Sequence, residues 1–547
     1  MCSSDLKGME IGTFHSICLR LLQKHLDFAL VDTFEALDLA ADALRQCGLK
    51  LGAKELLSHV SAVKSGLSQE DDASLAQAAK LYSQFLKDRG LFDFDDLLLQ
   101  CLGLFESLPK REKRPFTYLC IDEFQDVSPV QYKLALAWGK ESKGFFVIGD
   151  PDQSIYGFRG SSAHCFSDLR KTYPDLLQVH LLDNYRSTPE ILGAALPVIS
   201  KNPGPTRRLV PTRPSGPKVR LCTADSERSE AIFMAKEINR MVGGIDMLDV
   251  DTSHHVREKE SVRDFSDIAI LYRTHHQAKL IEKCLRTEGI PYIITGRDDT
   301  LNDEKVRGVI CLFRFLNDPR DVPALTTCLK SLLNCPADLV EGLALLPWEE
   351  ASLLKDRLEG IHQIASAYES VGSLLPWWSL VDVLLPQMGE SSPYKLIDTT
   401  VKQLGLTGLK PLENLQNMTV FYKNMASFLA ELALGSEGDV RRAADRYTSG
   451  AVSLMTLHGS KGLEFPVVFL SGVRKGSIPF ESVTHPADLE EERRLFYVGM
   501  TRAKEELIML TGKEPSPFLA DLPKALLEEE DLHRQLPTPK AEQLSLF

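Results

Sequence analysis

Short runs of β-branched and aromatic residues alternate with helical patterns in two separated zones of the chain. The first zone holds the runs Tyr118–Ile121, Phe145–Ile148 and Val179–Leu182. The second zone holds five more, at Lys218–Leu221, Ile268–Tyr272, Val452–Leu457, Val467–Leu470 and Leu507–Leu510. Because strands that alternate with helices form parallel sheets, the pattern predicts an α/β protein with two sheet-containing domains.

Two longer stretches have apolar residues at helical spacing and no strand pattern. Residues 26–95 are rich in Ala, Leu, Lys and Gln. Residues 318–446 are similar, with breaks at Pro347, Pro376, Pro386, Pro393 and Pro411. We expect each stretch to be a helical insertion in one of the two α/β domains.

These patterns predict the domain boundaries. The first domain is expected at residues 1–25 and 96–202, and the second at residues 203–317 and 447–514. A hinge rich in Pro and Arg, residues 202–217, separates them. Residues 515–547 are expected to form a flexible tail that carries an acidic helix over Glu528–Asp531.

Composition narrows the class of protein. Of the 547 residues, 44% are apolar and 25% are charged, and the net charge is −13 from 63 Lys and Arg against 76 Asp and Glu. That balance argues against a protein that coats nucleic acid nonspecifically, although it allows a local basic groove. The 11 cysteines are scattered without metal-ligand spacing, which indicates reduced thiols. With no secretory signal and no apolar stretch of about 20 residues, we expect a cytoplasmic protein without a membrane span.

Carboxylates follow the first strand directly. The apolar run Tyr118–Ile121 stops at Asp122 and Glu123, and Asp126 comes soon after. Acids at the carboxyl end of a parallel strand lie where open α/β sheets bind ligands. The arrangement suggests that the Asp holds a magnesium ion and that the Glu activates a water molecule.

Two polar loops in the first zone carry aromatic and basic residues. The segment V-I-G-D-P-D-Q-S-I-Y-G-F-R-G, residues 147–160, presents Gln153, Tyr156, Phe158 and Arg159 after a strand. Such aromatics can stack on unpaired bases, or they can simply be buried in a surface loop; the pattern alone leaves both open.

The segment L-L-D-N-Y-R-S-T-P-E, residues 181–190, ends in a helix start, because Ser187 or Thr188 precedes Pro189. Tyr185 and Arg186 then lie at a strand–helix junction. They are placed either to stack on a base and pair with a phosphate, or to pack and face solvent.

Two further motifs lie in the second zone. The Gly-rich loop in L-M-T-L-H-G-S-K-G-L-E-F, residues 454–465, carries His458, Lys461 and Glu464, and Glu464 can accept hydrogen bonds from ribose hydroxyls. The helix in E-E-E-R-R-L-F-Y-V-G-M-T-R-A-K, residues 490–504, delivers Arg502 at its far end. An arginine aimed at a cleft can stabilise charge in phosphoryl transfer.

Together with I-G-T-F-H-S at 11–16 and D-I-A-I-L-Y-R-T at 267–274, these motifs resemble, in their order, the superfamily-one helicases of the UvrD/Rep/PcrA type. The resemblance extends to about residue 512. It implies two RecA-like domains of the P-loop NTPase type, with ATP and Mg²⁺ bound between them and a helical insertion in each. The expected activity is ATP-dependent 3′→5′ DNA unwinding in bacterial repair or replication.

The resemblance also assigns roles by motif. It makes Asp122 the magnesium-associated acid, Glu123 the catalytic base and Gln153 the link between γ-phosphate and DNA. Tyr185 would stack on adenine, Glu464 would hold the ribose beside Gly462, and Arg186 and Arg502 would reach the γ-phosphate. The expected single-strand DNA contacts are Thr13, Phe14, His15, Tyr156, Phe158, Arg159, Tyr272, Arg273 and His458. Phe158 stands where the family usually has Trp.

The sequence departs from the family in two places. It contains no G-x-x-x-x-G-K-[ST] loop, which in the family cradles the β- and γ-phosphates. We expect an N-terminally truncated chain with an incomplete first domain; the alternative is a protein without its own ATPase activity. The stretch 318–446 also lacks the G-I-G-type hairpin motif that family members use near duplex DNA. The sequence therefore does not assign the residues that contact a duplex.

The last five residues, Q-L-S-L-F, resemble the pentapeptide that binds the bacterial sliding clamp. Gln543 and Leu544 with Leu546 and Phe547 suit capture of an extended peptide, although the alternative is an unbound, mildly apolar tail. The leading hypothesis is therefore a nucleoid-associated helicase with single-stranded and partly duplex DNA and the clamp as partners. The rival is a non-catalytic, clamp-tethered protein that binds single-stranded DNA. A helicase–nuclease is disfavoured because about 35 residues are too few for a nuclease domain.

Overall fold

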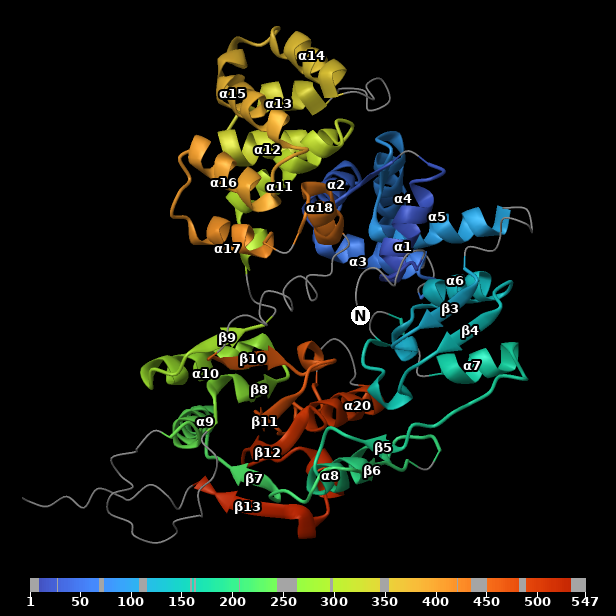
Figure 1. Ribbon diagram of the computed structural model, residues 1–547, viewed down its shortest axis with the longest axis vertical. Helices are drawn as coiled ribbons and strands as arrows, with labels where there is room; N and C mark the ends of the chain where they lie inside the picture. The colour runs from blue at the N-terminus through green and yellow to red at the C-terminus, as the bar shows by residue number, and fades with distance from the viewer. Residues whose placement is uncertain are drawn as a thin grey trace, which may run out of the picture. The chain divides into compact units, whose positions relative to one another are not determined.

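The computed structural model describes the chain in thirteen segments, which are residues 9–26, 28–67, 73–107, 116–157, 160–161, 164–205, 207–243, 263–295, 299–344, 354–420, 422–433, 450–481 and 488–532. The chain divides into two compact units (Figure 1). Unit 1 comprises Met1–Ile121, Val127–Val147 and Asp298–Arg446. Unit 2 comprises Asp122–Asp126, Ile148–Arg297 and Tyr447–Phe547.

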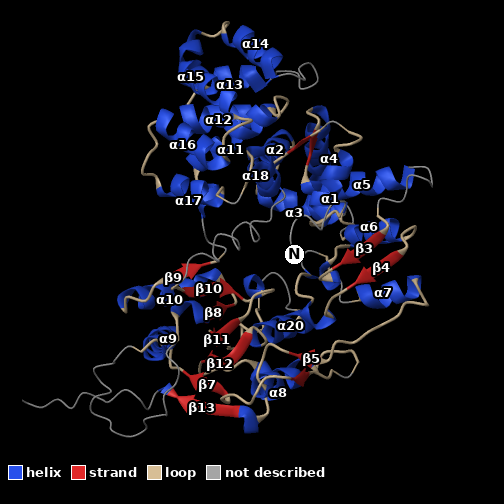
Figure 2. Cartoon of the chain, viewed as in Figure 1, coloured by secondary structure: helices blue, strands red, loops and turns tan. Residues whose placement is uncertain are grey.

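Unit 2 is built on a seven-stranded parallel sheet (Figure 2). The strands, in spatial order, are β13 (Leu527–Asp531), β7 (Val219–Thr223), β12 (Ala503–Thr511), β11 (Phe465–Leu470), β8 (Ile268–Tyr272), β10 (Val452–Thr456) and β9 (Tyr292–Ile294). Five of them lie on the five runs predicted for the second zone. The parallel sheet and the α/β class are therefore confirmed.

Helices cover both faces of this sheet. Along β8, Ala269 and Leu271 belong to the apolar cluster that α8 (Pro189–Ile199) and α20 (Leu489–Met500) cover. Ile268 and Ile270 belong to the cluster on the other face, under α9 (Glu227–Met241) and α10 (His275–Thr287). The alternation explains why β8 is apolar at every position, as is usual for a strand buried on both sides.

The remaining elements of unit 2 are short. They are the strands β5 (Asp183–Asn184) and β6 (Val210–Pro211), which pair with each other, the helix α7 (Cys165–Thr172), and the 3₁₀ turns η2 (Phe124–Asp126), η3 (Pro151–Gln153), η6 (Phe265–Asp267), η10 (His458–Ser460), η11 (Pro517–Asp521) and η12 (Lys524–Leu526). Most of these turns directly follow a strand or precede one. They therefore bring polar side chains to the strand ends.

Unit 1 contains both stretches that were predicted to be helical. The first part of the unit has α1 (Phe14–Leu22), α2 (Thr33–Gln46), α3 (Ala53–Lys64), α4 (Ala73–Asp88), α5 (Phe94–Ser107) and α6 (Pro129–Gly139), with the parallel pairs β1 (Ala29–Leu30) with β2 (Leu91–Phe92) and β3 (Tyr118–Ile121) with β4 (Gly144–Val147). The second part has η7 (Asp299–Asn302), α11 (Glu304–Asn317), α12 (Val322–Leu333), α13 (Ala337–Ala344), α14 (Leu354–Ala365), η8 (Glu369–Leu374), α15 (Leu375–Leu384), η9 (Leu385–Gln387), α16 (Pro393–Gln403), α17 (Lys410–Met418) and α18 (Met425–Ala433). Three of the predicted breaks, Pro376, Pro393 and Pro411, lie in the first turn of a helix, where proline is tolerated. Among the described helices, none is long and apolar enough to cross a membrane.

Some sequence predictions are wrong. The run Val179–Leu182 is not a strand: the observed strand β5 begins one residue later, Leu182 is joined to β6 through the N–H of Val210 at 2.8 Å, and Val179 and Leu181 are exposed. The expected acidic helix is the strand β13, so the tail is folded as far as residue 532. Strand pairing with β7, together with ion pairs from Arg220 to Glu530, outweighs the helical preference of a glutamate run. The pair β1–β2 also interrupts a stretch that was expected to be purely helical.

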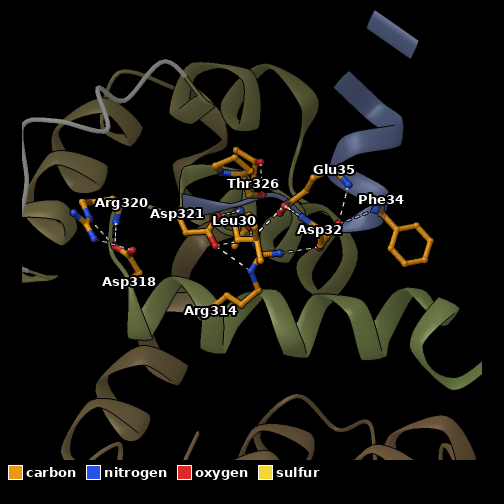
Figure 3. A network of polar contacts seen from close by, with 11 residues as sticks. Leu30, Asp32, Phe34, Glu35, Arg314, Asp318, Arg320, Asp321 and Thr326 are labelled. Atoms are coloured by element: carbon orange, nitrogen blue, oxygen red, sulfur yellow. Dashed lines mark hydrogen bonds and ion pairs between the residues drawn. The ribbon is translucent and has the colours of Figure 1, made fainter. Parts of the chain in front are cut away.

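One arginine joins the two helical parts of unit 1 (Figure 3). Arg314 of α11 donates from Nη1 to Asp32 Oδ2 at 2.8 Å and from Nη2 to Glu35 Oε2 at 3.1 Å. Its Nε donates to Asp321 Oδ2 at 3.0 Å, and Nη2 also donates to the carbonyl oxygen of Leu30 at 3.0 Å. Asp32 caps α2 and Asp321 caps α12, so a single guanidinium links two helix N-termini that are far apart in the sequence.

Candidate functional site

The acidic turn after β3 begins the site. Asp122 and Glu123 are both exposed, and Asp122 Oδ1 accepts the backbone N–H of Glu123 at 2.9 Å. Glu123 has a φ of 51°, in the left-handed region that costs a non-glycine residue about 1–3 kcal/mol. Gln125 donates its side-chain amide to Glu123 Oε2. The turn therefore presents two carboxylates to solvent, and the glutamate carries a fixed hydrogen bond.

Gln125 also ties this turn to the loop after β4. Its Oε1 accepts the N–H of Asp150 at 3.0 Å, and Phe124 donates its N–H to the carbonyl oxygen of Ile148 at 2.9 Å. A Cβ on Gly149 would lie 2.1 Å from Gln125 Oε1, so only glycine allows this close approach. The two predicted motifs, at 122–123 and at 150–153, are thus held side by side.

Lys461 reaches the acidic turn from the Gly-rich loop after β10. Its Nζ forms an ion pair with Asp126, donates to the carbonyl oxygen of Gln153 at 2.6 Å and lies 3.9 Å from Glu123 Oε2. Its side chain is only 7% exposed. Burial raises the pKa of Asp126 despite the ammonium group beside it. Lys461 was quoted in its motif but not predicted as a site residue, because partners so far apart in sequence are visible only in the fold.

Gln153 and Arg502 meet beside this cluster. Gln153 donates from Nε2 to Asp150 Oδ2 at 2.8 Å and accepts at Oε1 from Arg502 Nη2 at 3.4 Å. Arg502 follows α20, is 1% exposed, and also donates to the carbonyl oxygens of Val498 and Leu463. Burial, and then the positive charge of Arg186, lower the pKa of Arg502 to about 10. Two cations that repel each other in this way favour an anion between them.

A pocket of about 450 Å³ gathers three predicted residues, Tyr185, Arg186 and Glu464. Arg186 Nε donates to Glu464 Oε2 at 2.6 Å, and Lys504 Nζ lies 2.7 Å from Glu464 Oε1. These hydrogen bonds, led by the one from Lys504, lower the pKa of Glu464 to about 2, so it is ionised. The ring of Tyr185 is 75% exposed. The other lining residues, not predicted, are Asp183, Asn184, Arg213 and Lys504.

Local backbone contacts position the pocket. Asn184 Oδ1 accepts the N–H groups of Arg186 and Ser187, which forms an Asx turn after β5. Ser187 donates its hydroxyl to the carbonyl oxygen of Ala503 at 2.6 Å, at the start of β12. Before Glu464, Gly462 has a φ of 78°, and this left-handed turn leads the chain into Glu464 and β11. The pocket therefore offers a stacking face, cations for phosphate and a carboxylate for hydroxyl groups.

The residues of unit 2 that were predicted to contact single-stranded DNA lie in different environments. Tyr156 lies beside His458, with 6.3 Å between the ring centroids, and both side chains are partly exposed. Tyr272 is fully buried in the core of unit 2, and its contact with single-stranded DNA stays a prediction. Arg273 forms an ion pair with Glu492 at 2.7 Å and lies over the ring of Phe480. Phe158 and Arg159 lie outside the described residues, as do Gln543, Leu544, Leu546 and Phe547.

The predicted contacts at 13–15 lie in unit 1. Thr13 caps α1 by accepting the N–H of Ser16 at 3.2 Å. Phe14 stacks on Trp138 with 5.5 Å between ring centroids, and His15 meets Phe94 edge-on at 5.9 Å. Burial lowers the pKa of His15. In this structure Thr13 caps α1, and Phe14 and His15 pack against aromatic side chains of unit 1. Their contact with single-stranded DNA stays a prediction.

Comparison with known families gives two matches. The model of the UvrD/REP helicase N-terminal domain matches residues 1–174. The model of the UvrD-like helicase C-terminal domain matches residues 179–348 and 407–514. The break in the second match, residues 349–406, falls within the residue range of unit 1.

Curated relatives align along most of the chain. The chain is 29% identical to the ATP-dependent DNA helicase PcrA of Bacillus subtilis (strain 168), covering 95% of the chain and 76% of that protein. It is 27% identical to PcrA of Staphylococcus epidermidis (strain ATCC 12228 / FDA PCI 1200), covering 99% of the chain and 80% of that protein. It is also 27% identical to PcrA of Staphylococcus aureus (strain Mu50 / ATCC 700699), covering 97% of the chain and 78% of that protein.

Proposed function

The chain belongs to the UvrD/REP family of helicases, and on this premise we propose that it is an ATP-dependent DNA helicase that translocates 3′→5′. The observation that carries the proposal is the pocket that brings Tyr185, Arg186 and Glu464 together. Its aromatic face, ionised carboxylate and cations match the base, ribose and phosphates of a nucleotide. The relatives PcrA are ATP-dependent DNA helicases by name, which supports the same ligand and substrate.

In this proposal, each pocket residue has one task. Tyr185 stacks on the adenine, and Glu464 accepts hydrogen bonds from the ribose. Arg186, now paired with Glu464, turns to the γ-phosphate when a nucleotide is bound, and Arg502 meets the same phosphate from α20. Since bringing an anion between Arg186 and Arg502 relieves their repulsion, phosphate binding is favoured.

The acidic turn supplies the hydrolytic groups. The exposed carboxylate of Asp122 suits Mg²⁺, which is usually held by one or two carboxylates together with water and phosphate oxygens. When bound, the ion would neutralise charge on the phosphates. Glu123 takes the proton of the attacking water, and Gln125 holds the carboxylate through its amide. Gln153 orients the water, because its side chain is already fixed by Asp150.

The described site supplies contacts to base, ribose, γ-phosphate and water. The sequence has no G-x-x-x-x-G-K-[ST] loop, so it supplies no backbone cradle of that type for the β- and γ-phosphates. A second candidate function follows from this observation. In it, the chain binds nucleotide and single-stranded DNA without turning ATP over, and it is held near replicating DNA by its last five residues.

One experiment separates the two candidates. ATP binding is measured by calorimetry, and phosphate release is measured with and without single-stranded DNA, in the wild-type chain and in Glu123→Gln. A helicase releases phosphate faster with DNA, and Glu123→Gln stops release while ATP still binds. Binding without release in the wild type favours the non-catalytic candidate, and absence of ATP binding refutes both.

Direction is tested on partial duplexes. Duplexes of equal length carry a single-stranded tail at either the 3′ or the 5′ end. The proposal expects unwinding of the substrate with the 3′ tail only. Equal unwinding of both, or preference for the 5′ tail, contradicts the proposed polarity. A role in repair or replication is proposed from the relatives' activity.

A further inference from the structure

One loop of unit 2 carries both Gln153, which is expected to link the γ-phosphate to DNA and is proposed to orient the attacking water, and Tyr156, an expected contact of single-stranded DNA. We define the bridging loop as residues 150–157, which include Gln153 and Tyr156. The loop is held on its phosphate side by Lys461, which donates to the carbonyl oxygen of Gln153. Gln125 of the acidic turn and Arg207, whose guanidinium donates to Asp152, also hold the loop. Three further anchors come from the helix α20 or its end.

The first anchor is Glu491, in the first turn of α20. Its Oε1 accepts the backbone N–H of Gly157 at 2.9 Å. A Cβ on Gly157 would lie 2.5 Å from Glu491 Oε2, so the carboxylate sits directly against the backbone of the loop. The contact fixes the residue that follows Tyr156.

The second anchor is Arg494, one turn further along the helix. Its Nε donates to the carbonyl oxygen of Ser154 at 2.9 Å, and its side chain is 13% exposed. Next to it, Ile155 is fully buried in the same apolar cluster as Leu495 of α20. Because Ser154 also donates its hydroxyl to the carbonyl oxygen of Gln125, the middle of the loop cannot shift without disturbing the acidic turn.

The third anchor is Arg502, just beyond the C-terminal end of α20. Its Nη2 donates a hydrogen bond to Gln153 Oε1. A helix rises about 1.5 Å per residue, so α20 spans about 13.5 Å between Glu491 and its last residue, Met500, and Arg502 follows two residues later. The bridging loop is thus attached to that element at three points. The loop and the helix are expected to move as one body.

We infer that Glu491 and Arg494 are positioning residues. By holding the bridging loop on α20, they couple the binding of nucleotide to the binding of single-stranded DNA. The inference rests on the proposed function, because it requires nucleotide contacts at Gln153 and Arg502 and strand contacts at Tyr156. When a phosphate binds Arg502 and Gln153 and displaces them, α20 moves with them. Because Glu491 of α20 holds Gly157, this movement also shifts Gly157 and the ring of Tyr156. Neither residue needs to touch either ligand.

The test measures thermodynamic linkage. Affinity for a fluorescent oligo(dT) is determined by anisotropy, without nucleotide and with a saturating non-hydrolysable ATP analogue. The ratio of the two affinities is the coupling factor, which for linked sites is typically about 5- to 150-fold. Glu491→Ala and Arg494→Met should bring this factor close to one, while the separate affinities for each ligand change by less than about threefold, because neither side chain is a ligand contact.

Conservative and matched variants complete the test. Glu491→Gln keeps an acceptor for the Gly157 N–H and should retain most of the coupling. Glu490→Ala removes a neighbouring, exposed carboxylate that lies 3.7 Å from Arg494 Nη1 and does not contact the bridging loop in the described structure, and it should behave as the wild type. Arg494→Met keeps its apolar stem, so it serves as a second variant if Glu491→Ala does not fold.

The outcomes are distinguishable. A wild type that binds neither ligand refutes the proposed function, and with it this inference. A wild type that binds both ligands independently refutes the inference alone. A folded Glu491→Ala or Arg494→Met that retains the full coupling factor also overturns it, since each residue is proposed to hold the loop.

Discussion

The ring of Tyr185 is largely exposed although it lies among charged groups, and it therefore offers a free face to a ligand. Stacking of a base on an aromatic side chain is typically worth about 1–3 kcal/mol. We expect Tyr185→Ala to weaken ATP binding by about 5- to 150-fold, measured by calorimetry. Tyr185→Phe keeps the ring and should bind as the wild type. Equal losses in both variants would mean that the hydroxyl group, not the ring, carries the contact.

Glu35 predicts a pH dependence at the residue scale. Burial raises the pKa of its carboxyl from 4.5 to about 8. Between these pH values the folded chain keeps a proton that the unfolded chain has lost. The contribution is fully present below about pH 4.5 and is lost as the pH rises through 8, so the free energy of unfolding falls by about 1.4 kcal/mol per pH unit.

Glu35→Gln mimics the protonated carboxyl and should flatten this slope between pH 5 and 8. Hydrogen exchange of the α2 amides, corrected for intrinsic exchange rates, measures the local free energy of opening. Glu55→Gln, at an exposed position of α3, is the matched control and should keep the wild-type slope. A Glu35→Gln variant with the wild-type slope would show that another group titrates in this range.

Some site residues were predictable and others were not, for a physical reason. Tyr185, Arg186 and Glu464 lie in motifs whose residue types already suit a nucleotide, and the structure brings them into one pocket. Lys504 joins the same pocket only because β12 starts beside Ser187. A contact between segments distant in sequence leaves no local pattern to read.

The junction around Arg314 is the clearest case at the scale of elements. Its guanidinium donates hydrogen bonds to the acids that cap α2 and α12 and to Glu35, so its loss leaves three buried or half-buried carboxyl groups without their donor (Figure 3). We expect Arg314→Met to lower the free energy of unfolding of unit 1 by about 3–5 kcal/mol, measured by chemical denaturation.

Arg320→Met is the control for that measurement. Arg320 pairs with Asp318, two residues away, and both side chains are 29% exposed. A partly exposed pair of this kind is worth at most about 1 kcal/mol, so the control should unfold close to the wild type. If both variants lose the same free energy, the junction at Arg314 has no special role.

At the same scale, the strand β8 shows why complete burial makes an element predictable. The range predicted for β8 coincides with the observed strand, because both faces of the strand are covered and every position is apolar. β13 was missed because its glutamates carry no strand pattern; the strand exists because β7 offers a free edge and Arg220 offers a counter-charge. The strand predicted at Val179–Leu182 was wrong in the opposite sense, because pairing with β6 begins only at Leu182 and the strand itself is Asp183–Asn184.

At the scale of the whole molecule, the proposed clamp contact depends on the last five residues. Deleting Gln543–Phe547 should abolish capture of the chain by an immobilised bacterial sliding clamp, while ATP and single-strand affinities stay unchanged. The reason is that an extended peptide binds through its own side chains and backbone. Replacing the five residues by Gly and Ser is the matched control for length, and undiminished capture of either variant contradicts the proposal.

The sequence by itself determined the α/β class, the family and the residue types of the nucleotide pocket. These follow from strand periodicity and from motifs that each lie within a few residues, so no knowledge of distant neighbours is needed. Only the tertiary structure decided which charges meet. The Lys461–Asp126 pair, the two cations on Glu464 and the Arg314 junction each join segments far apart in sequence, and burial of a charge is stable only where the fold supplies its partner.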